Sequence, residues 1–393
     1  MIIILLFCLC LAAKNYEVYG SMSNFSKIED LELEEQLKAI NKPPVKSIQT
    51  EFGRIVDCID INKQLAFDHP LLKNHKIQLK FSFQDTQTNT KSHDRSGYSK
   101  IGLDDKDLCP KGTIPVQRTT KDDLIRAKRL SNNFGTLTKF DRGSHFAGIR
   151  IRGRIFFGVK GNLDVYNPPV DDHQMSSAYI YVSTGESSIP VPNHMFIHAG
   201  WQAYPGMSGD KLTHFFVEWV RNIIQHTGCT NMLCSGFVQT SQKIYVGAPV
   251  ANVSSYGGPQ FTMSLNLTQD PATKNWWLKA QDMDVGYFPA SLFSNKLDFA
   301  MKAGWTGHTQ FFLDGPSPPM GSGILPDGNP LHSCYISKMY FKDRFRNDRA
   351  PLKDQMLVYA DNRRCYDAKY YGFVDNNLER VMMFGGPGGN CGL

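Results

Sequence analysis

The chain has 393 residues, of which 41% are hydrophobic and 12% aromatic, so it can bury one large core or two smaller ones. Its 33 glycines and 21 prolines follow no short period, which excludes a collagen-like chain and favours many short strands joined by turns. The formal net charge of +6 is a mild bias. No basic–aromatic motif of a nucleic-acid reader accompanies it, so we expect no nucleic-acid partner.

The N-terminus carries an uninterrupted apolar run, Ile2–Ala13. This run is too short to cross a bilayer, which takes ~20 residues, but it suits the apolar core of a secretory signal. Small residues at Gly20-Ser21 offer a cleavage site. We therefore expect a signal peptide over residues 1–20 and a secreted product, extracellular or in a cell wall, with no membrane span and as a monomer.

Two kinds of pattern follow along the chain. Residues 26–42 and 119–130 have helical spacing, and Ile55–Ile61 alternates like a strand, which predicts a small mixed α/β region. From His145 on, strands dominate, and their frequency predicts an antiparallel β-sandwich or barrel. The expected elements include single strands over 147–159, 175–184, 195–199, 212–223, 238–245 and 309–313, and a helix over 290–300.

Cysteine usage points to an oxidising compartment. Cys8 and Cys10 lie in the signal, which leaves seven cysteines, enough for three disulfides and one free thiol. Cys229 and Cys234 have no second close pair at zinc-type spacing, so we expect no metal site and no cofactor.

The stretch from Phe196 to Gln239 carries the most specific motifs. It contains an Ala-Gly-Trp box, a P-x-x-x-G-D turn at 205–210 and the loop TGCTNMLCSGFVQ, and FGGPGGNC follows near the C-terminus. Together with VDCIDINKQLAFDHPLLKNH at 56–75, these motifs resemble the neprosin family of plant secreted peptidases. The resemblance implies an activation propeptide over 21–140, which binds the chain's own β-sandwich domain over 145–393. Pairing of nearest neighbours within each segment predicts the disulfides Cys58–Cys109, Cys229–Cys234 and Cys365–Cys391, with Cys334 free, and the latter two match the family's loops.

The resemblance also implies a glutamic endopeptidase that cuts beside proline, with two glutamates sharing the acid and base roles. This chain departs from that pattern. After Glu51 its only glutamates are Glu186, Glu218 and Glu379, and none stands at a family dyad position. The family's W-G-G-E box reads Trp-Thr-Gly-His here, which puts His308 at one position. The other aligns with His198, beside the Ala-Gly-Trp box, or with Gln202 just after it.

Three interpretations remain open for these histidines. The family chemistry is lost; or a facing His198–His308 pair exchanges protons near neutral pH; or the pair chelates a divalent metal. On the first interpretation both rings are cationic below pH ~6.5 and cannot activate water at acid pH. Glu218 lies on a strand face with Phe216 and Val220, where it either projects into the cleft and supplies one acid or stays on a solvated face.

Trp201, Gln202, Tyr204 and Trp305 flank the two candidate positions and are expected to line a groove. The expected ligand is a proline-rich polypeptide or a cell-wall chain, since aromatic faces stack on proline rings and sugars alike. No G-x-S-x-G elbow indicates serine chemistry. Asn24, Asn252 and Asn266 are N-glycosylation acceptors, as expected of a secreted glycoprotein.

Overall fold

A computed structural model describes residues 27–82, 97–134, 143–153, 155–185, 194–222, 227–312 and 315–392. The predicted signal peptide, Asn24 and Glu186 lie outside these ranges. Within them, no helix is long and apolar enough to cross a membrane.

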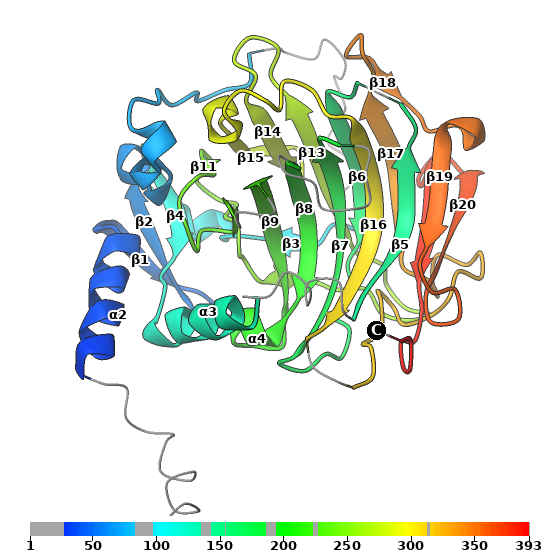
Figure 1. Ribbon diagram of the computed structural model, residues 1–393, viewed down its shortest axis with the longest axis horizontal. Helices are drawn as coiled ribbons and strands as arrows, with labels where there is room; N and C mark the ends of the chain where they lie inside the picture. The colour runs from blue at the N-terminus through cyan, green and yellow to red at the C-terminus, as the bar shows by residue number, and fades with distance from the viewer. Residues whose placement is uncertain are drawn as a thin grey trace, which may run out of the picture.

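Two antiparallel sheets packed face to face make up most of the described chain, which confirms the predicted β-sandwich (Figure 1). One sheet has seven strands. In spatial order it consists of β10 (Thr227–Thr230), β9 (Thr213–Asn222), β8 (Phe196–Ala203), β7 (Gln174–Ser183), β16 (Lys302–Phe311), β5 (Ser144–Ile151) and β19 (Met356–Ala360).

The second sheet has nine strands over the described residues. Its path is β11 (Val238–Gln239), β15 (Met283–Phe288), β14 (Trp276–Ala280), β13 (Thr262–Gln269), β6 (Gly158–Asp164), β17 (Tyr335–Lys342), β21 (Arg380–Gly385) and β20 (Asp367–Phe373), with β18 (Asp348–Arg349) paired to β17.

The core between the sheets follows from side-chain alternation, since successive strand residues face opposite sides. On β7, Ala178, Ile180 and Val182 are fully buried, as their alternation with the tyrosines predicted. Trp201 and Trp305 lie in the same core with no exposed surface. Each indole Nε1 donates to a backbone carbonyl of β6, that of Asp164 at 2.8 Å and that of Lys160 at 3.0 Å. The prediction that these two tryptophans line a groove is therefore wrong.

The N-terminal region, residues 27–134, is a smaller α/β unit beside the sandwich, on the left of Figure 1. Its three-stranded sheet has the order β1-β2-β4, and a short β3 pairs with β12 of the sandwich side. Its elements are α2 (Lys27–Ile40), β1 (Pro44–Gln49), β2 (Ile55–Asp60), β3 (Lys100–Ile101), β4 (Thr113–Gln117) and α3 (Lys121–Phe134), and the partner strand is β12 (Val250–Ala251). Both predicted helices are present.

Several predicted boundaries are wrong. The strand expected over 147–159 is two, β5 and β6, because Arg152-Gly153 interrupts it, and the strand expected over 238–245 ends at Gln239. The helix expected over 290–300 is only a 3₁₀ turn, Ala290–Phe293. Strand β16 begins seven residues before the expected start, through two glycines that lower strand propensity. Strands β15 and β21 were not expected.

Three disulfides join the expected pairs: Cys58–Cys109 in the N-terminal region, and Cys229–Cys234 and Cys365–Cys391 in the sandwich. Cys334 is free and buried in the core. Burial raises the pKa of its thiol well above the ordinary value, so this cysteine is an inert core residue and not a nucleophile.

Candidate functional site

The outer face of the seven-stranded sheet carries both histidine positions. Paired strand residues share a face, so the register sorts this surface into rows across β8, β7 and β16. His198 lies beside Tyr181, and Tyr181 beside Gly304. His308 belongs to another row, beside Ser177, which pairs with Gln202. Tyr179 occupies the row between them, flanked by Gly200 and Thr306.

Glycines next to the two tyrosines shape this surface. A Cβ on Gly304 would lie 2.8 Å from the hydroxyl of Tyr181, and one on Gly200 would lie 2.7 Å from the Cβ of Tyr179. Both distances are shorter than ordinary van der Waals contacts, so a larger residue at either glycine would displace a tyrosine. The glycines therefore let Tyr179 and Tyr181 lie close to the sheet.

A continuous array of five rings runs through the two candidate positions. Phe196 stacks on His198 with ring centroids 4.1 Å apart, and His198 stacks on Tyr179 at 4.4 Å. Tyr179 meets His308 at 6.3 Å with the two rings nearly perpendicular, and His308 stacks on Phe146 at 4.2 Å. The two imidazoles thus pack as aromatic groups within one array.

Tyr179 separates the two histidines. Their partner positions on β7 are Tyr181 and Ser177, four residues apart, which is about 13 Å along a strand. Ring contacts among the described residues join each imidazole to Tyr179 and not to the other imidazole. The hypothesis of a directly facing His198–His308 pair that shares one proton therefore receives no support from the geometry.

His308 is held in its neutral form. Its ring is largely enclosed, and its Nε2 is buried without a protein hydrogen-bond partner. This burial, with a further contribution from the charge of His198, lowers the pKa of His308 to about 3. The expectation that His308 is cationic below pH ~6.5 is therefore wrong, because the ring stays neutral through most of the acid range.

His198 has a carboxylate partner. Glu218 lies directly opposite it on β9, and Oε2 of Glu218 is 3.2 Å from Nδ1 of His198. The two side chains are 34% and 17% exposed, so solvent and ligands reach this pair. Of the two alternatives for Glu218, the structure supports projection onto the cleft face. The site thus offers one accessible imidazole–carboxylate pair.

A pocket of about 80 Å³ adjoins the row of His308 at the edge formed by β8 and β9. Gln202 and Tyr204, both expected groove residues, line it together with His214. Its other wall comes from Gln117 and Thr119 of the N-terminal region. The N-terminal region therefore closes this side of the cleft.

Several cleft residues could not be singled out from sequence motifs. Phe146, Phe196 and Tyr179 complete the ring array, yet none belongs to a motif box. The alternation of the strand at 175–184 was the available signal for Tyr179 and Tyr181, because it places both on the face opposite the aliphatic core residues. Among the described residues, no group of three or more His, Cys, Asp or Glu side chains is arranged to hold a metal ion.

Two solved structures resemble the sandwich weakly. Scytalido-glutamic peptidase, solved with a transition state analog inhibitor, has a TM-score of 0.35 and 11% identity, over 62% of this chain and 98% of that chain. A glycoside hydrolase family 16 endo-glucanase from Bacteroides ovatus has a TM-score of 0.24 and 10% identity, over 44% and 68% of the two chains. These TM-scores are too low to carry an argument about function.

Family models give a definite result. The Neprosin activation peptide model matches residues 47–147, which covers most of the N-terminal region. The Neprosin model matches residues 172–387, more than half of the chain and nearly all of the sandwich. The expected boundaries at residues 140 and 145 stay a prediction, but the assignment is plain: this protein belongs to the Neprosin family.

Proposed function

We propose that this protein is a secreted Neprosin-family member that keeps the family's cleft but lacks carboxylate-pair hydrolysis, and that it binds proline-rich polypeptides there. The proposal includes a signal peptide at residues 1–20, an activation peptide that masks the cleft, and N-glycosylation at Asn24, Asn252 and Asn266.

One observation carries the proposal: the residues at both proposed dyad positions, His198 and His308, are packed into a ring array. A carboxylate pair works because two acids at short range split their pKa values, so that one is a base while the other remains an acid. The array has no such pair, and His308, with a pKa lowered to about 3, cannot donate a proton at pH 4–6 because it holds none to spare.

The same rings favour a ligand with flat apolar faces. Phe196, His198 and Tyr181 are partly exposed on the cleft face, next to the exposed end of Glu218. Proline rings pack well against aromatic faces, and an extended proline-rich chain adds little conformational entropy cost on binding, because it is already stiff. A glycan of the cell wall is the competing ligand for such a surface.

Calorimetric titration tests the binding. The chain is first cut between the activation peptide and the sandwich, and the activation peptide is removed. The remaining protein is titrated with a proline-rich peptide and separately with a soluble cell-wall glycan. We expect saturable binding of the peptide, weakened about tenfold by Phe196→Ala through loss of ring contact. Tyr256→Ala, at a 60% exposed aromatic residue outside the cleft, is the matched control and should bind like the wild type. Glycan binding without peptide binding would reject the proposed ligand.

A second candidate function is hydrolysis near neutral pH through the His198–Glu218 pair. The 3.2 Å contact favours it, because a carboxylate that orients an imidazole makes the ring a better general base. On this alternative, slow cleavage of the proline-rich peptide appears near pH 7 and is abolished by Glu218→Gln. Absence of cleavage over a day at pH 7, with binding intact, would leave binding as the function.

A further inference from the structure

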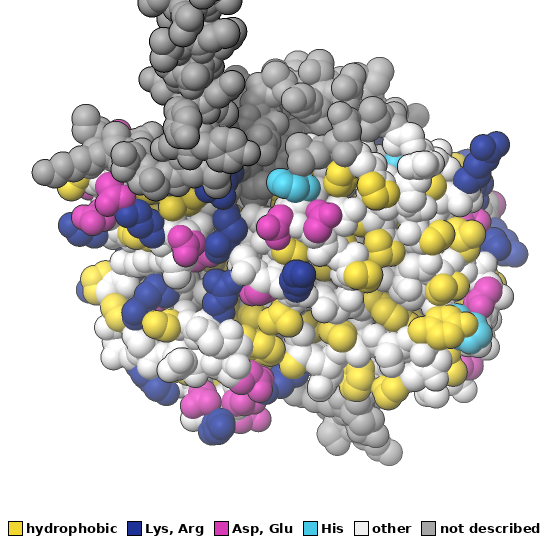
Figure 2. Space-filling view, turned by 90° about the horizontal axis from the view of Figure 1, so that it is seen from below, with side chains coloured by type: hydrophobic (Ala, Val, Ile, Leu, Met, Phe, Trp, Pro, Cys, Tyr) yellow, Lys and Arg dark blue, Asp and Glu magenta, His cyan; other side chains and the backbone are white. Residues whose placement is uncertain are grey.

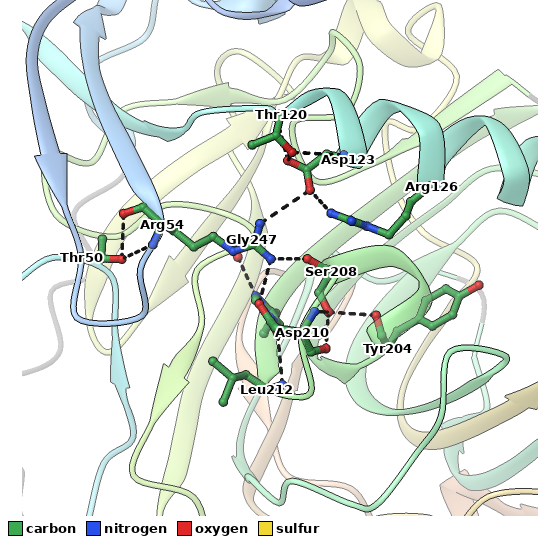
Figure 3. A network of polar contacts seen from close by, with 11 residues as sticks. Thr50, Arg54, Thr120, Asp123, Arg126, Tyr204, Ser208, Asp210, Leu212 and Gly247 are labelled. Carbon is green, nitrogen blue, oxygen red and sulfur yellow. Dashed lines mark hydrogen bonds and ion pairs between the residues drawn. The ribbon is translucent and has the colours of Figure 1, made fainter. Parts of the chain in front are cut away.

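A charged network joins the activation peptide to the turn between β8 and β9 (Figure 3). Arg54, in the turn after β1, extends its guanidinium to the sandwich. One of its terminal nitrogens, Nη2, donates to Oδ2 of Asp210 at 2.9 Å and also to the carbonyl oxygen of Ser208. The side chains of Arg54 and Asp210 are 18% and 25% exposed, so the contact is largely shielded from water.

The sandwich holds Asp210 in place for this contact. Oδ1 of Asp210 accepts from the backbone N–H of Leu212 at 3.1 Å and lies 2.7 Å from Nε2 of His214. The other ring nitrogen of His214 is anchored on the carbonyl oxygen of Gly247 at 2.9 Å. One carboxylate oxygen is therefore satisfied inside the sandwich, and the second is presented to Arg54.

The surrounding residues complete the site from the activation-peptide side. Asp123 of α3 lies 3.6 Å from Nη1 of Arg54 and pairs with Arg126. Arg126 packs on Gly209, whose φ of +76° ends the short helix α4 (Pro205–Ser208), and a Cβ there would lie 2.5 Å from the guanidinium. The turn thus accepts two arginine side chains from the activation peptide.

No disulfide crosses between the two parts of the described chain. Cys58–Cys109 lies within the activation peptide, and the other two disulfides lie within the sandwich. Once the chain is cut between them, contacts such as this network are what holds the activation peptide in place. Figure 2 shows charged side chains of both signs gathered on the left, over the activation-peptide side of the molecule.

We infer that the turn Pro205–Asp210 is a guanidinium-binding site of the sandwich, filled in the intact chain by Arg54 and open to an arginine side chain of another polypeptide once the activation peptide leaves. Two acceptors of the sandwich, Oδ2 of Asp210 and the carbonyl oxygen of Ser208, contact Nη2 of Arg54, while its Nη1 faces Asp123 of the activation peptide. A terminal guanidinium nitrogen carries two hydrogens, which satisfy both acceptors, and its charge pairs with the Asp210 carboxylate.

The site does not depend on the catalytic state of the cleft. It lies beside the 80 Å³ pocket, which Ser208, His214 and Gly247 line from the sandwich and Gln117, Thr119 and Asp123 line from the activation peptide, so departure of that peptide opens the pocket on one side. An arginine side chain of a polypeptide bound in the cleft would bind to this turn. The turn is therefore a specificity site as well as an anchor for the activation peptide.

The test uses the full chain with a site-specific protease sequence placed between Phe134 and Gly143. After cutting, the retained activation peptide is quantified by size-exclusion chromatography over a dilution series. We expect Arg54→Ala to raise the dissociation constant at least tenfold, and Arg54→Lys to recover only part of this loss. Arg129→Ala, at an exposed arginine of helix α3 of the activation peptide, is the control and should change the dissociation constant less than twofold.

A double-mutant cycle and a competitor make the assignment specific. In an Asp210→Asn background, Arg54→Ala should have a smaller further effect than in the wild type, because the charge that Arg54 binds is gone and only the Ser208 carbonyl contact remains. N-acetyl-arginine amide at high concentration should displace the peptide from the wild type more than the uncharged N-acetyl-citrulline amide does. Equal effects of Arg54→Ala and Arg129→Ala would overturn the inference. Effects of Arg54→Ala and Asp210→Asn that simply multiply in the double variant would also overturn it, and so would equal displacement by the two amides.

Discussion

The neutral state of His308 makes a quantitative prediction about acid stability. The pKa of His308 is about 3 in the folded protein and about 6.5 in the unfolded chain, so between these values the unfolded state binds one more proton. Stability therefore falls as pH falls through this window, by ~1.4 kcal/mol per pH unit at most. The unfolded histidine is half protonated at about pH 6.5. Between pH 6.5 and pH 4.5, the neutral state of His308 in the folded protein should lower the unfolding free energy by about 2 kcal/mol.

Replacing His308 with glutamine removes this proton without adding another titrating group. The variant loses ring stacking on Phe146 at all pH values, so the useful quantity is the pH dependence and not the absolute stability. Between pH 6.5 and 4.5 the wild type should lose about 2 kcal/mol more unfolding free energy than His308→Gln. Urea unfolding followed by tryptophan fluorescence measures this, since all five tryptophans lie in the sandwich.

Histidines that do not interact with His308 drop out of the comparison. Burial also lowers the pKa values of His69, His75 and His194, but these groups contribute equally in both proteins and cancel in the difference. The reasoning is refuted if the two proteins show the same stability loss between pH 6.5 and 4.5, which would mean that His308 charges freely in the folded state.

Three further predictions concern other parts of the molecule. The pKa of Asp210 is lowered to about 2: burial opposes this, but the contacts with His214 and Arg54 outweigh it. The His214 contact persists in the free sandwich, so only the Arg54 part of this shift is linked to docking. The dissociation constant of the cut activation peptide should rise as the pH falls toward 2, and less so in Arg54→Ala. Cys334 should react with iodoacetamide only after unfolding, and a disulfide to Cys334 in a non-reducing peptide map would contradict the pairing. Trp201→Ala should lower the unfolding free energy by about 3–5 kcal/mol in urea titrations, whereas loss below 1 kcal/mol would contradict its place in the core.

The sequence predicted those features of the fold that rest on local patterns. Helices α2 and α3 follow from apolar spacing, and the tyrosine face of β7 follows from strict alternation. Strand β16 was placed too late because Gly304 and Gly307 lower strand propensity, while tertiary packing of Tyr181 and Phe384 against them favours the strand.

Strand alternation by itself excludes a groove lined by both tryptophans and both histidines. His198 and Trp201 are three residues apart on β8, and Trp305 and His308 are three apart on β16. Residues an odd number apart in a strand face opposite sides, so the histidines and tryptophans could not all line one groove. The contact between Arg54 and Asp210 spans 156 residues and depends on how two units dock, which no local pattern shows.

The most direct test of the proposed loss of carboxylate-pair hydrolysis is a cleavage assay at pH 3. Wild-type protein and His198→Glu/His308→Glu, each cut and freed of the activation peptide, are incubated with a proline-rich peptide, and products are identified by mass spectrometry. We predict no cleavage by the wild type and none by the double variant, because Tyr179 lies between the two positions and carboxylates placed there could not share one water. Cleavage after proline by the wild type at pH 3 would contradict the account.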